Sequence, residues 1–117
     1  MERTEAQKFA EEWIDAWNSH DLDRVLANYE DDFEITSPLI REVVNEPRGM
    51  LKGKAAIRAY WSRALELNPD LRFELRHVYV GVDSITIVYS GTRGMSAEVL
   101  IFAPSGKIAR TYAHHSL

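Results

Sequence analysis

The sequence predicts an α+β fold in which a largely antiparallel sheet packs against helices. The first observation is a strong amphipathic helical pattern over residues 3–19, with a second long one that begins at Gly53. The second observation is that the chain after Leu71 alternates apolar and polar residues or is rich in β-branched ones, as strands are. The order of elements is helix, helix, strand, helix and then four strands, which is typical of α+β domains.

The composition is that of one ordinary globular domain. The chain has 117 residues, 45% hydrophobic and 27% charged, and we treat residues 1–117 as a single domain. The net charge of −4 and the lack of a basic run argue against a nucleic-acid partner. No apolar run approaches the roughly 20 residues of a membrane span, so we expect a cytoplasmic protein with no membrane partner. The chain has no cysteine, which excludes disulfides and thiolate chemistry.

The predicted helices follow from apolar spacing and from residues that begin or end a helix. The first helix presents its apolar residues at intervals of three and four, and "NSHD" ends it. Asp21 is a good N-cap for a short second helix, and Gly53 opens the third. The apolar residues of the first and third helices are Ala6, Phe9, Ala10, Trp13, Ile14 and Trp17, and Ala56, Ile57, Tyr60, Trp61, Ala64 and Leu65.

Residues 38–53 are predicted to form a long connection between the first strand, Phe33 to Thr36, and the third helix. Connections longer than about 12 to 15 residues are usually functional or mobile. This one contains "PLIREVVNEP", in which Leu39 and Ile40 start a single apolar turn that Pro47 stops. A lid over a pocket and a plain packed loop are both compatible with this pattern.

The later strands are "LRFELRHVYVGV", "SITIVYSG" and the two halves of "SAEVLIFAPSGKIARTYAHHS", which turn at Pro104 to Gly106. The run from Thr86 to Tyr89 offers apolar surface on both sides of its strand, whereas a strand with one wet face normally alternates cleanly. We therefore expect helices on one face of the sheet and a second copy of the chain on the other, as a homodimer.

Three segments together resemble the nuclear transport factor two-like superfamily, in particular its SnoaL-like and ketosteroid-isomerase-like members. They are "WIDAWNSHDLDRVLANYEDDFEI", "GKAAIRAYW" and "EVLIFAPSGKIARTYAHHS". The resemblance implies a cone-shaped, curved, mostly antiparallel sheet packed on three helices, with an interior apolar pocket and a dimer through the outer sheet face. Members of the superfamily include isomerases, dehydratases, cyclases and binding modules, so the fold does not specify a function.

The resemblance also tests whether the steroid-isomerase chemistry is present. By position in those segments, Ser37 takes the place of the catalytic base, Trp13 that of an oxyanion-binding tyrosine, and Glu98 that of a protonated acid. Of these three polar roles, only that of the acid is retained, by Glu98. A serine is no base by itself, and an indole only donates a hydrogen bond. Isomerase chemistry in its usual form is therefore rejected.

The candidate catalytic pair is Glu98 and His115. Glu98 would face the pocket, although a rim position or a structural ion pair is about as plausible. The match places His115 inward and His114 outward, but a bulge would exchange them, and a histidine bonded to backbone is the plain alternative. Two adjacent histidines on a strand point to opposite faces and are a weak metal signal, so we expect no metal and no cofactor.

The remaining pocket candidates are mostly aromatic, as small-molecule sites usually are. Ser37 would orient a substrate, while Trp13 and Trp17 serve equally well as core residues. The ligand pocket expected from the resemblance consists of Trp13, Trp17, Tyr29, Phe33, Ser37, Leu39, Tyr60, Trp61, Phe73 and Phe102. Two functions remain open at this point: an acid–base enzyme acting on an apolar or polyketide-like molecule, and a ligand-binding or assembly module without turnover.

Overall fold

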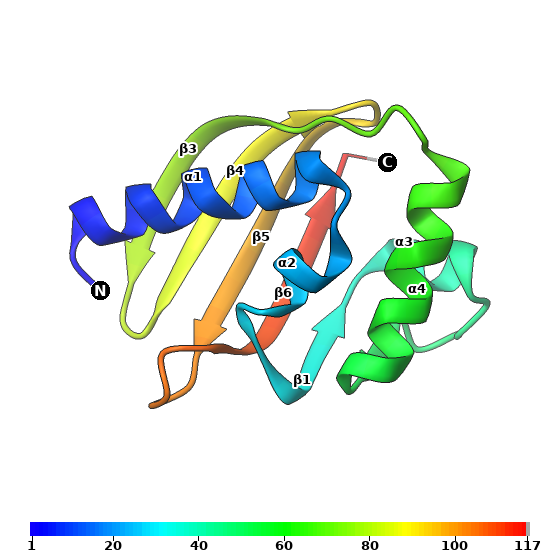
Figure 1. The fold of residues 1–117 in the computed structure, drawn as a ribbon, viewed down its shortest axis with the longest axis horizontal. Coiled ribbons are helices and arrows are strands. Elements are labelled where there is room, and N and C mark those ends of the chain that lie inside the picture. Colours follow the sequence, from blue (N-terminus) through cyan, green and yellow to red (C-terminus); the bar gives the residue numbers. More distant parts are fainter. Residues whose placement is uncertain (117) are drawn as a thin grey trace.

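The computed structural model describes residues 1–116 as a curved six-stranded sheet with helices on one face (Figure 1). This confirms the predicted α+β class. The helices are α1 (Arg3–Ser19), α2 (Leu22–Leu26), α3 (Pro38–Val43) and α4 (Lys54–Leu67). The strands are β1 (Tyr29–Thr36), β2 (Met50–Lys52), β3 (Glu74–Gly81), β4 (Ser84–Gly91), β5 (Gly94–Phe102) and β6 (Ile108–His115).

The strands lie in the order β2-β1-β6-β5-β4-β3, and the sheet is not closed. Neighbouring strands are antiparallel except for β1 and β6, which are parallel and place Ile35 opposite Thr111. The first strand of the chain is thus hydrogen-bonded to the last. The predicted turn around Pro104 to Gly106 does join β5 to β6.

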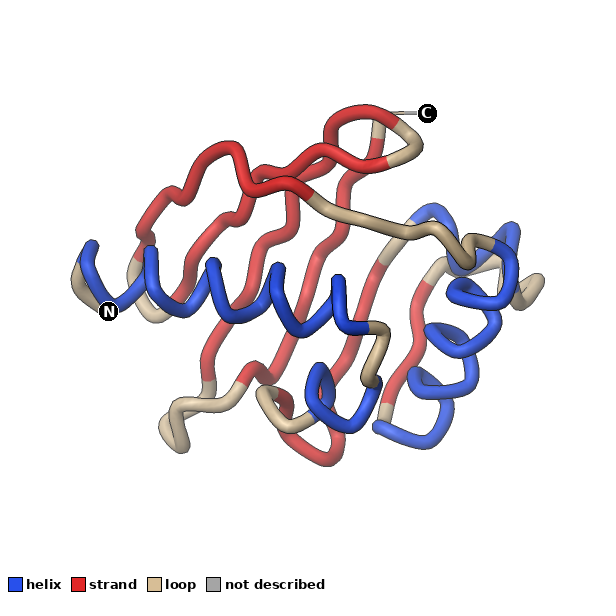
Figure 2. Tube along the Cα trace, turned by 45° about the horizontal axis from the view of Figure 1, so that its top comes forward, coloured by secondary structure: helices blue, strands red, loops and turns tan. Residues whose placement is uncertain are grey.

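Helix α1 crosses the concave face of the sheet, and α4 packs beside β1 and β2 (Figure 2). The predicted apolar stripe of α1 is largely its buried face: Ala6, Ala10, Trp13, Ile14 and Trp17 are buried, Phe9 is half-buried, and Ala16, which was not predicted, is buried as well. The helix ends at His20, whose φ of 61° lies in the left-handed region. Burial of this stripe supplies most of the stability of such a helix, since isolated helices of this length are marginal in water.

The carboxyl end of α1 fixes the chain that leads into β3. The Asn18 side chain donates from Nδ2 to the Phe73 carbonyl at 2.9 Å and accepts from the Phe73 N–H at 2.7 Å. The His20 ring nitrogen Nε2 lies 2.8 Å from the Leu71 carbonyl oxygen. His20 therefore bonds to backbone, but 51 residues away along the chain rather than within its own turn.

The structure of segment 38–53 differs from the prediction, which was three helices in the chain and one long connection here. It holds a fourth helix, α3, and an edge strand, β2. Ser37 is the N-cap of α3, its hydroxyl accepting from the Leu39 N–H at 3.2 Å, and Pro38 occupies the first turn, where a missing N–H does no harm. The Ser37 N–H donates to the Gly49 carbonyl at 2.9 Å, which ties the two ends of this segment together.

A β-bulge in β3 changes which side chains face the core. The pairing of β3 with β4 shifts between Leu75 and His77, so that Leu75 and Val78 are half-buried while His77 is exposed. Regular alternation after Phe73 and Leu75 predicts a core histidine at His77, and this prediction is wrong because the extra residue reverses the alternation of side chains.

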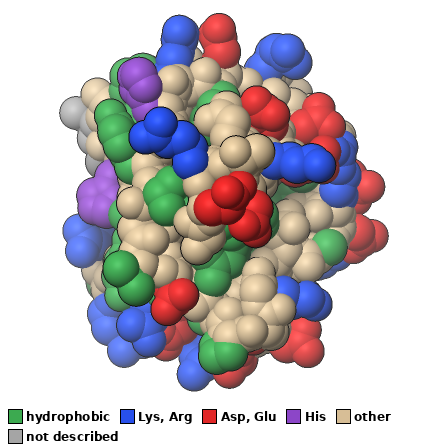
Figure 3. Space-filling view, turned by 90° about the vertical axis from the view of Figure 1, so that its left-hand side faces the viewer, with side chains coloured by type: hydrophobic (Ala, Val, Ile, Leu, Met, Phe, Trp, Pro, Cys, Tyr) green, Lys and Arg blue, Asp and Glu red, His purple; other side chains and the backbone are tan. Residues whose placement is uncertain are grey.

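The other face of the sheet carries no helix in the part of the chain that the structure describes. Hydrophobic and histidine side chains gather along the left margin of Figure 3, which belongs to this face. The side chains on it include Tyr79, Val88, Val99, Ile101 and Tyr112, and Tyr79 is 59% exposed. Within residues 1–116, the helices are all too short or too polar to cross a membrane.

Candidate functional site

A cavity of about 80 Å³ lies between the sheet, α1, α3 and α4. Eight of the predicted site residues line it, namely Trp17, Ser37, Leu39, Tyr60, Trp61, Phe73, Glu98 and His115. A second lobe of about 90 Å³ shares Leu39, Phe73, Tyr89 and His115 with the first and extends to Thr92 and Arg93 in the turn between β4 and β5. The two lobes form one path from the surface at Arg93 to the buried carboxyl of Glu98. We call them the inner lobe and the mouth.

Glu98 is the one acidic residue that lines the inner lobe. The strand alternation that places Leu100 in the core also turns Glu98 inward, and its side chain is 8% exposed. Burial raises the pKa of Glu98 from its ordinary value of 4.5 to about 7, because the charged form loses its hydration. The Tyr89 hydroxyl donates to Glu98 Oε1 at 2.7 Å and holds back part of this rise.

The side chains around Glu98 are weak acids that stay protonated. Burial, and then the nearby Glu98 carboxylate, raise the pKa of Tyr29 and of Tyr89 well above the usual tyrosine value. Burial likewise raises the pKa of Tyr60 to about 12, with the Ser37 hydroxyl opposing the rise. At neutral pH these phenols are therefore hydrogen-bond donors, and Glu98 is the group in the cavity that changes charge near neutrality.

Trp17 supplies a hydrogen-bond donor without an acceptor. Its indole Nε1 is buried and has no hydrogen-bond partner within residues 1–116, whereas the indole of Trp13 donates to the Tyr29 hydroxyl at 3.0 Å. A buried N–H without a partner costs about 1 to 3 kcal/mol. Because Trp17 lines the inner lobe, an acceptor atom in a bound molecule would recover this energy.

His115 stands where the inner lobe meets the mouth. It is half-buried and His114 is exposed, so the inward placement expected for His115 is the one observed. Its Nδ1 lies 2.8 Å from the Ser96 hydroxyl. Burial lowers the pKa of His115 below its usual 6.5, and the cations Arg93 and His114 lower it further against the opposing charge of Glu42. His115 is accordingly a neutral base near pH 7.

Four predicted pocket residues do not line the cavity. Trp13, Tyr29 and Phe33 lie fully buried behind its wall, in the aromatic core beneath α1 and α4. Phe102 lies at the far end of β5, where its ring meets that of Phe9 edge-on at 5.2 Å between centroids. Phe102 does lie on the same face of the sheet as Glu98, opposite the buried Ile108, but it is too far along β5 to reach the cavity.

The Ser37 hydroxyl has a structural role at the position of the expected base. It accepts the Leu39 N–H as the cap of α3, and the same hydroxyl, as a hydrogen-bonding neighbour, opposes the rise that burial causes in the pKa of Tyr60. Leu39 lines both lobes, as expected of a residue that covers the pocket, but Ile40 is fully buried in the core. An ion pair between Arg93 and Glu42, at 3.2 Å, joins the mouth to α3.

Tyr89, Ser96 and Arg93 are site residues that sequence reasoning missed. Tyr89 lies directly opposite Ser96, and Ser96 directly opposite His115. Tyr89, Ser96 and His115 therefore meet only because the pairing of β4, β5 and β6 brings them together. No local spacing could have shown this. The turn signal "GTRG" would have located Arg93 at a hairpin tip, at the same end of the sheet as His115.

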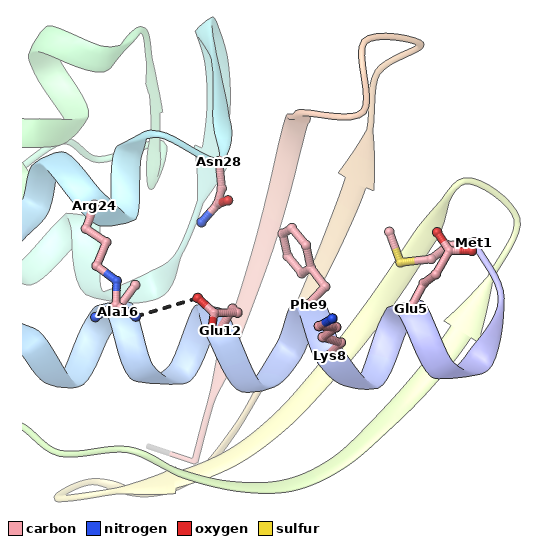
Figure 4. Close-up of a pocket in the computed structure, with 8 residues that line it drawn as sticks. All are labelled: Met1, Glu5, Lys8, Phe9, Glu12, Ala16, Arg24 and Asn28. Carbon is pink, nitrogen blue, oxygen red and sulfur yellow. Dashed lines mark ion pairs between the residues drawn. The ribbon is translucent and has the colours of Figure 1, made fainter.

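A larger and more open hollow of about 500 Å³ lies along the outer side of α1 (Figure 4). It is lined by Met1, Glu5, Lys8, Phe9, Glu12, Ala16, Arg24 and Asn28. Its charged groups face solvent and neutralise one another, as in the ion pair of Arg24 with Glu12 at 3.6 Å. The inner lobe is smaller but holds the buried carboxyl and the unpartnered indole, so we take it as the candidate site. Across residues 1–116, no three histidine or acidic side chains converge to hold a metal ion.

The comparisons with known proteins agree with this architecture. The model of the SnoaL-like domain family matches residues 10–114. A SnoaL-like protein of unknown function from Burkholderia thailandensis is 44% identical, with a TM-score of 0.94 over 99% of this chain and 98% of that one. The search of curated proteins finds no significant match.

Two more distant structures show the same fold. SalBIII, an epoxide hydrolase/cyclase-like enzyme in pyran ring formation in the polyether salinomycin, is 16% identical, with a TM-score of 0.74 over 99% of this chain and 94% of that one. TerC, co-crystallised with polyporic acid, is 14% identical, with a TM-score of 0.71 over 90% of this chain and 86% of that one. With the family model matching residues 10–114, this chain belongs to the SnoaL-like domain family.

Proposed function

We propose that the protein is an acid–base enzyme of the isomerase, cyclase or dehydratase type, acting on a small apolar or polyketide-like carbonyl compound in the inner lobe. The observation that carries this proposal is the buried Glu98 carboxyl, whose pKa of about 7 lets it give or take a proton at neutral pH. A pocket that only binds an apolar molecule gains nothing from a buried carboxyl, which costs free energy when it is charged.

The geometry gives each polar group a role. A substrate carbonyl oxygen in the inner lobe would accept from the unpartnered Trp17 N–H and from protonated Glu98, the two donors that stabilise an enolate. His115, neutral and at the junction with the mouth, would remove a proton from the carbon beside the carbonyl. Ser37, whose hydroxyl caps α3, would orient the substrate through the same hydroxyl group.

The size of the cavity limits the substrate. Ligand sites are usually about 300 to 1,000 Å³, whereas the inner lobe holds about 80 Å³ and the mouth about 90 Å³. A ring compound must therefore occupy both lobes and displace Leu39, the side chain between them. The ion pair of Arg93 and Glu42 is about half exposed on both sides, and such pairs contribute less than about 1 kcal/mol. Breaking this ion pair at the mouth is thus energetically cheap.

Proton exchange of a simple ketone tests the enzymatic role without knowledge of the natural substrate. In D₂O, exchange of the protons next to the carbonyl of cyclohexanone is followed by proton NMR with the wild type, Glu98→Gln and His115→Gln. We expect the wild type to accelerate exchange over buffer and each variant to lose at least tenfold. Glu74→Gln on the exposed side of β3 is the matched control and keeps the wild-type rate.

The alternative is a binding or assembly module without turnover. One observation favours it: the end of β1, where the resemblance implies a catalytic base, holds Ser37, whose hydroxyl caps α3. Binding of cyclohexanone and 2-tetralone, measured by tryptophan fluorescence, to which the lobe residues Trp17 and Trp61 contribute, separates the two functions. If both ketones bind and neither exchanges protons faster than in buffer, the module is the correct description.

A second copy of the chain is the partner that we propose for the helix-free face of the sheet. Val99, Ile101 and Tyr112 bring apolar area to the middle of this face, where solvated strands would carry polar residues. A two-fold axis through this face would bury the patch against itself. We expect roughly 800 Å² or more to be buried on each subunit, as in stable dimers.

A further inference from the structure

Four polar side chains stand next to one another on the concave face of the last three strands. Tyr89 of β4 is opposite Ser96 of β5, and Ser96 is opposite His115 of β6. Glu98 lies two residues after Ser96 and therefore on the same face of β5. The group begins in the inner lobe at Glu98 and ends in the mouth at His115.

Hydrogen bonds hold both ends of this group, and strand pairing places its two middle members opposite each other. The Tyr89 hydroxyl donates to Glu98 Oε1 at 2.7 Å, and the Ser96 hydroxyl, directly across from Tyr89, opposes as a hydrogen-bonding neighbour the rise that burial causes in the pKa of Tyr89. The Ser96 hydroxyl lies 2.8 Å from His115 Nδ1. A hydroxyl group both donates and accepts, so each of the two central residues can receive a proton on one side and release one on the other.

We propose that Tyr89 and Ser96 form a proton relay that joins the buried carboxyl of Glu98 to the imidazole of His115. When Glu98 is ionised, every bond points toward it: His115 Nδ1–H donates to Ser96, Ser96 to Tyr89, and Tyr89 to the carboxylate. When Glu98 is protonated and no carbonyl compound occupies the inner lobe, every bond is reversed, and Ser96 donates to an unprotonated Nδ1. The direction of these hydrogen bonds therefore depends on the charge of Glu98.

Transfer along the relay conserves protons. Glu98 gives its proton to the Tyr89 oxygen, Tyr89 gives its own to the Ser96 oxygen, and Ser96 gives its own to His115 Nδ1. The result is a carboxylate and an imidazolium. Loss of the Nε2 proton from the mouth side leaves neutral His115 in the Nδ1–H tautomer. Glu98 would thus exchange protons with the mouth when a bound molecule fills the inner lobe and excludes water from it.

Other charged groups around the two ends do not replace the relay. His115 is surrounded by Arg93 from the turn between β4 and β5, Glu42 from α3 and His114 from its own strand. Glu98 faces the phenols of Tyr29, Tyr60 and Tyr89. These groups shift the pH at which Glu98 and His115 titrate. Tyr89 and Ser96 are the two side chains that lie between them, Tyr89 bonded to Glu98 and Ser96 bonded to His115.

The relay deepens the proposed function, since it would restore the protonation state of Glu98 after each turnover, but its test needs no substrate. The tautomer of His115 is read from its ring nitrogen shifts in ¹⁵N-histidine-labelled protein between pH 6 and 8.5. In the wild type we expect the Nε2–H tautomer to give way to the Nδ1–H tautomer as pH rises through about 7, where Glu98 ionises. In Glu98→Gln the tautomer ratio stays constant.

Ser96→Ala removes the link between the two ends and should leave one tautomer at every pH. Ser96→Thr keeps the hydroxyl and should restore the switch, which a purely structural role for Ser96 does not predict. Ser62→Ala on α4 is the control and switches as the wild type does. The relay is overturned if the wild-type tautomer is the same at pH 6 and pH 8.5, or if Ser96→Ala still switches. An inactive protein that switches would sink the proposed reaction and leave the relay standing.

Discussion

Replacing Glu98 by Gln should remove a pH-dependent loss of stability. The folded protein raises the pKa of this carboxyl from 4.5 to about 7, so the folded state binds the proton more tightly than the unfolded chain does. Folding is therefore undisturbed by Glu98 below about pH 4.5. It is progressively penalised as pH rises toward 7, and the penalty is complete above that pH. Glutamine is neutral throughout and keeps an oxygen that accepts from the Tyr89 hydroxyl.

The size of the penalty follows from the change in pKa. One pKa unit corresponds to about 1.4 kcal/mol, so the rise from 4.5 to about 7 corresponds to roughly 3 kcal/mol. This is a large part of the 5 to 15 kcal/mol by which domains are usually stable. No discount for solvent applies, because Glu98 is only 8% exposed.

Urea unfolding at half-unit intervals from pH 4.5 to 8.5, followed by tryptophan fluorescence, measures the effect. We expect Glu98→Gln and the wild type to have similar unfolding free energies at pH 4.5. The variant should be more stable by about 3 kcal/mol at pH 8. Taking the difference between the two proteins cancels the titration of all other groups. Curves that run parallel over the whole range would refute the reasoning, since they would mean that Glu98 titrates alike in both states.

Three further substitutions probe the fold and its surface. Thr111→Val should raise the unfolding free energy in urea by about 1 kcal/mol, because the Thr111 hydroxyl is fully buried without a partner in the part of the chain that the structure describes; a loss of stability would reveal an unseen partner. Ser37→Ala should lower the thermal midpoint through a loss of about 1 kcal/mol from the uncapped α3, and an unchanged midpoint would contradict the capping role. Val99→Glu should convert a dimer to a monomer in sedimentation experiments, and a wild type that is already monomeric at micromolar concentration would rule out the proposed interface.

The fold was predictable because its largest parts follow simple periodicities. The apolar stripe of α1 and the hairpin at Pro104 to Gly106 were both readable, as was the inward turn of Glu98, since alternation holds along most of β5. The six residues of α3 and the three of β2 were not readable, because elements this short give too few repeats to establish a period.

The site was predictable only where single strands determine it. Glu98 and His115 follow from alternation along their own strands once the resemblance sets its phase, whereas Tyr89 and Ser96 belong to the site through their pairing across three strands. His77 was misplaced because it lies beside a shift of register that local sequence does not reveal. Phe102 has the expected inward orientation but lies beyond the cavity, at the far end of β5.

The parallel pairing of β1 with β6 has a consequence for how the chain acquires its structure. Ile35 reaches its partner Thr111 only after almost the whole chain has been synthesised. The aromatic side chains of α1 and β1 therefore stay exposed to solvent while the remaining strands are synthesised. Contacts so distant along the chain slow folding and leave apolar surface open to aggregation in the meantime. We expect a fragment that stops before Ile108 to stay unfolded, and the last eight residues of the sheet to complete the domain in a single late step.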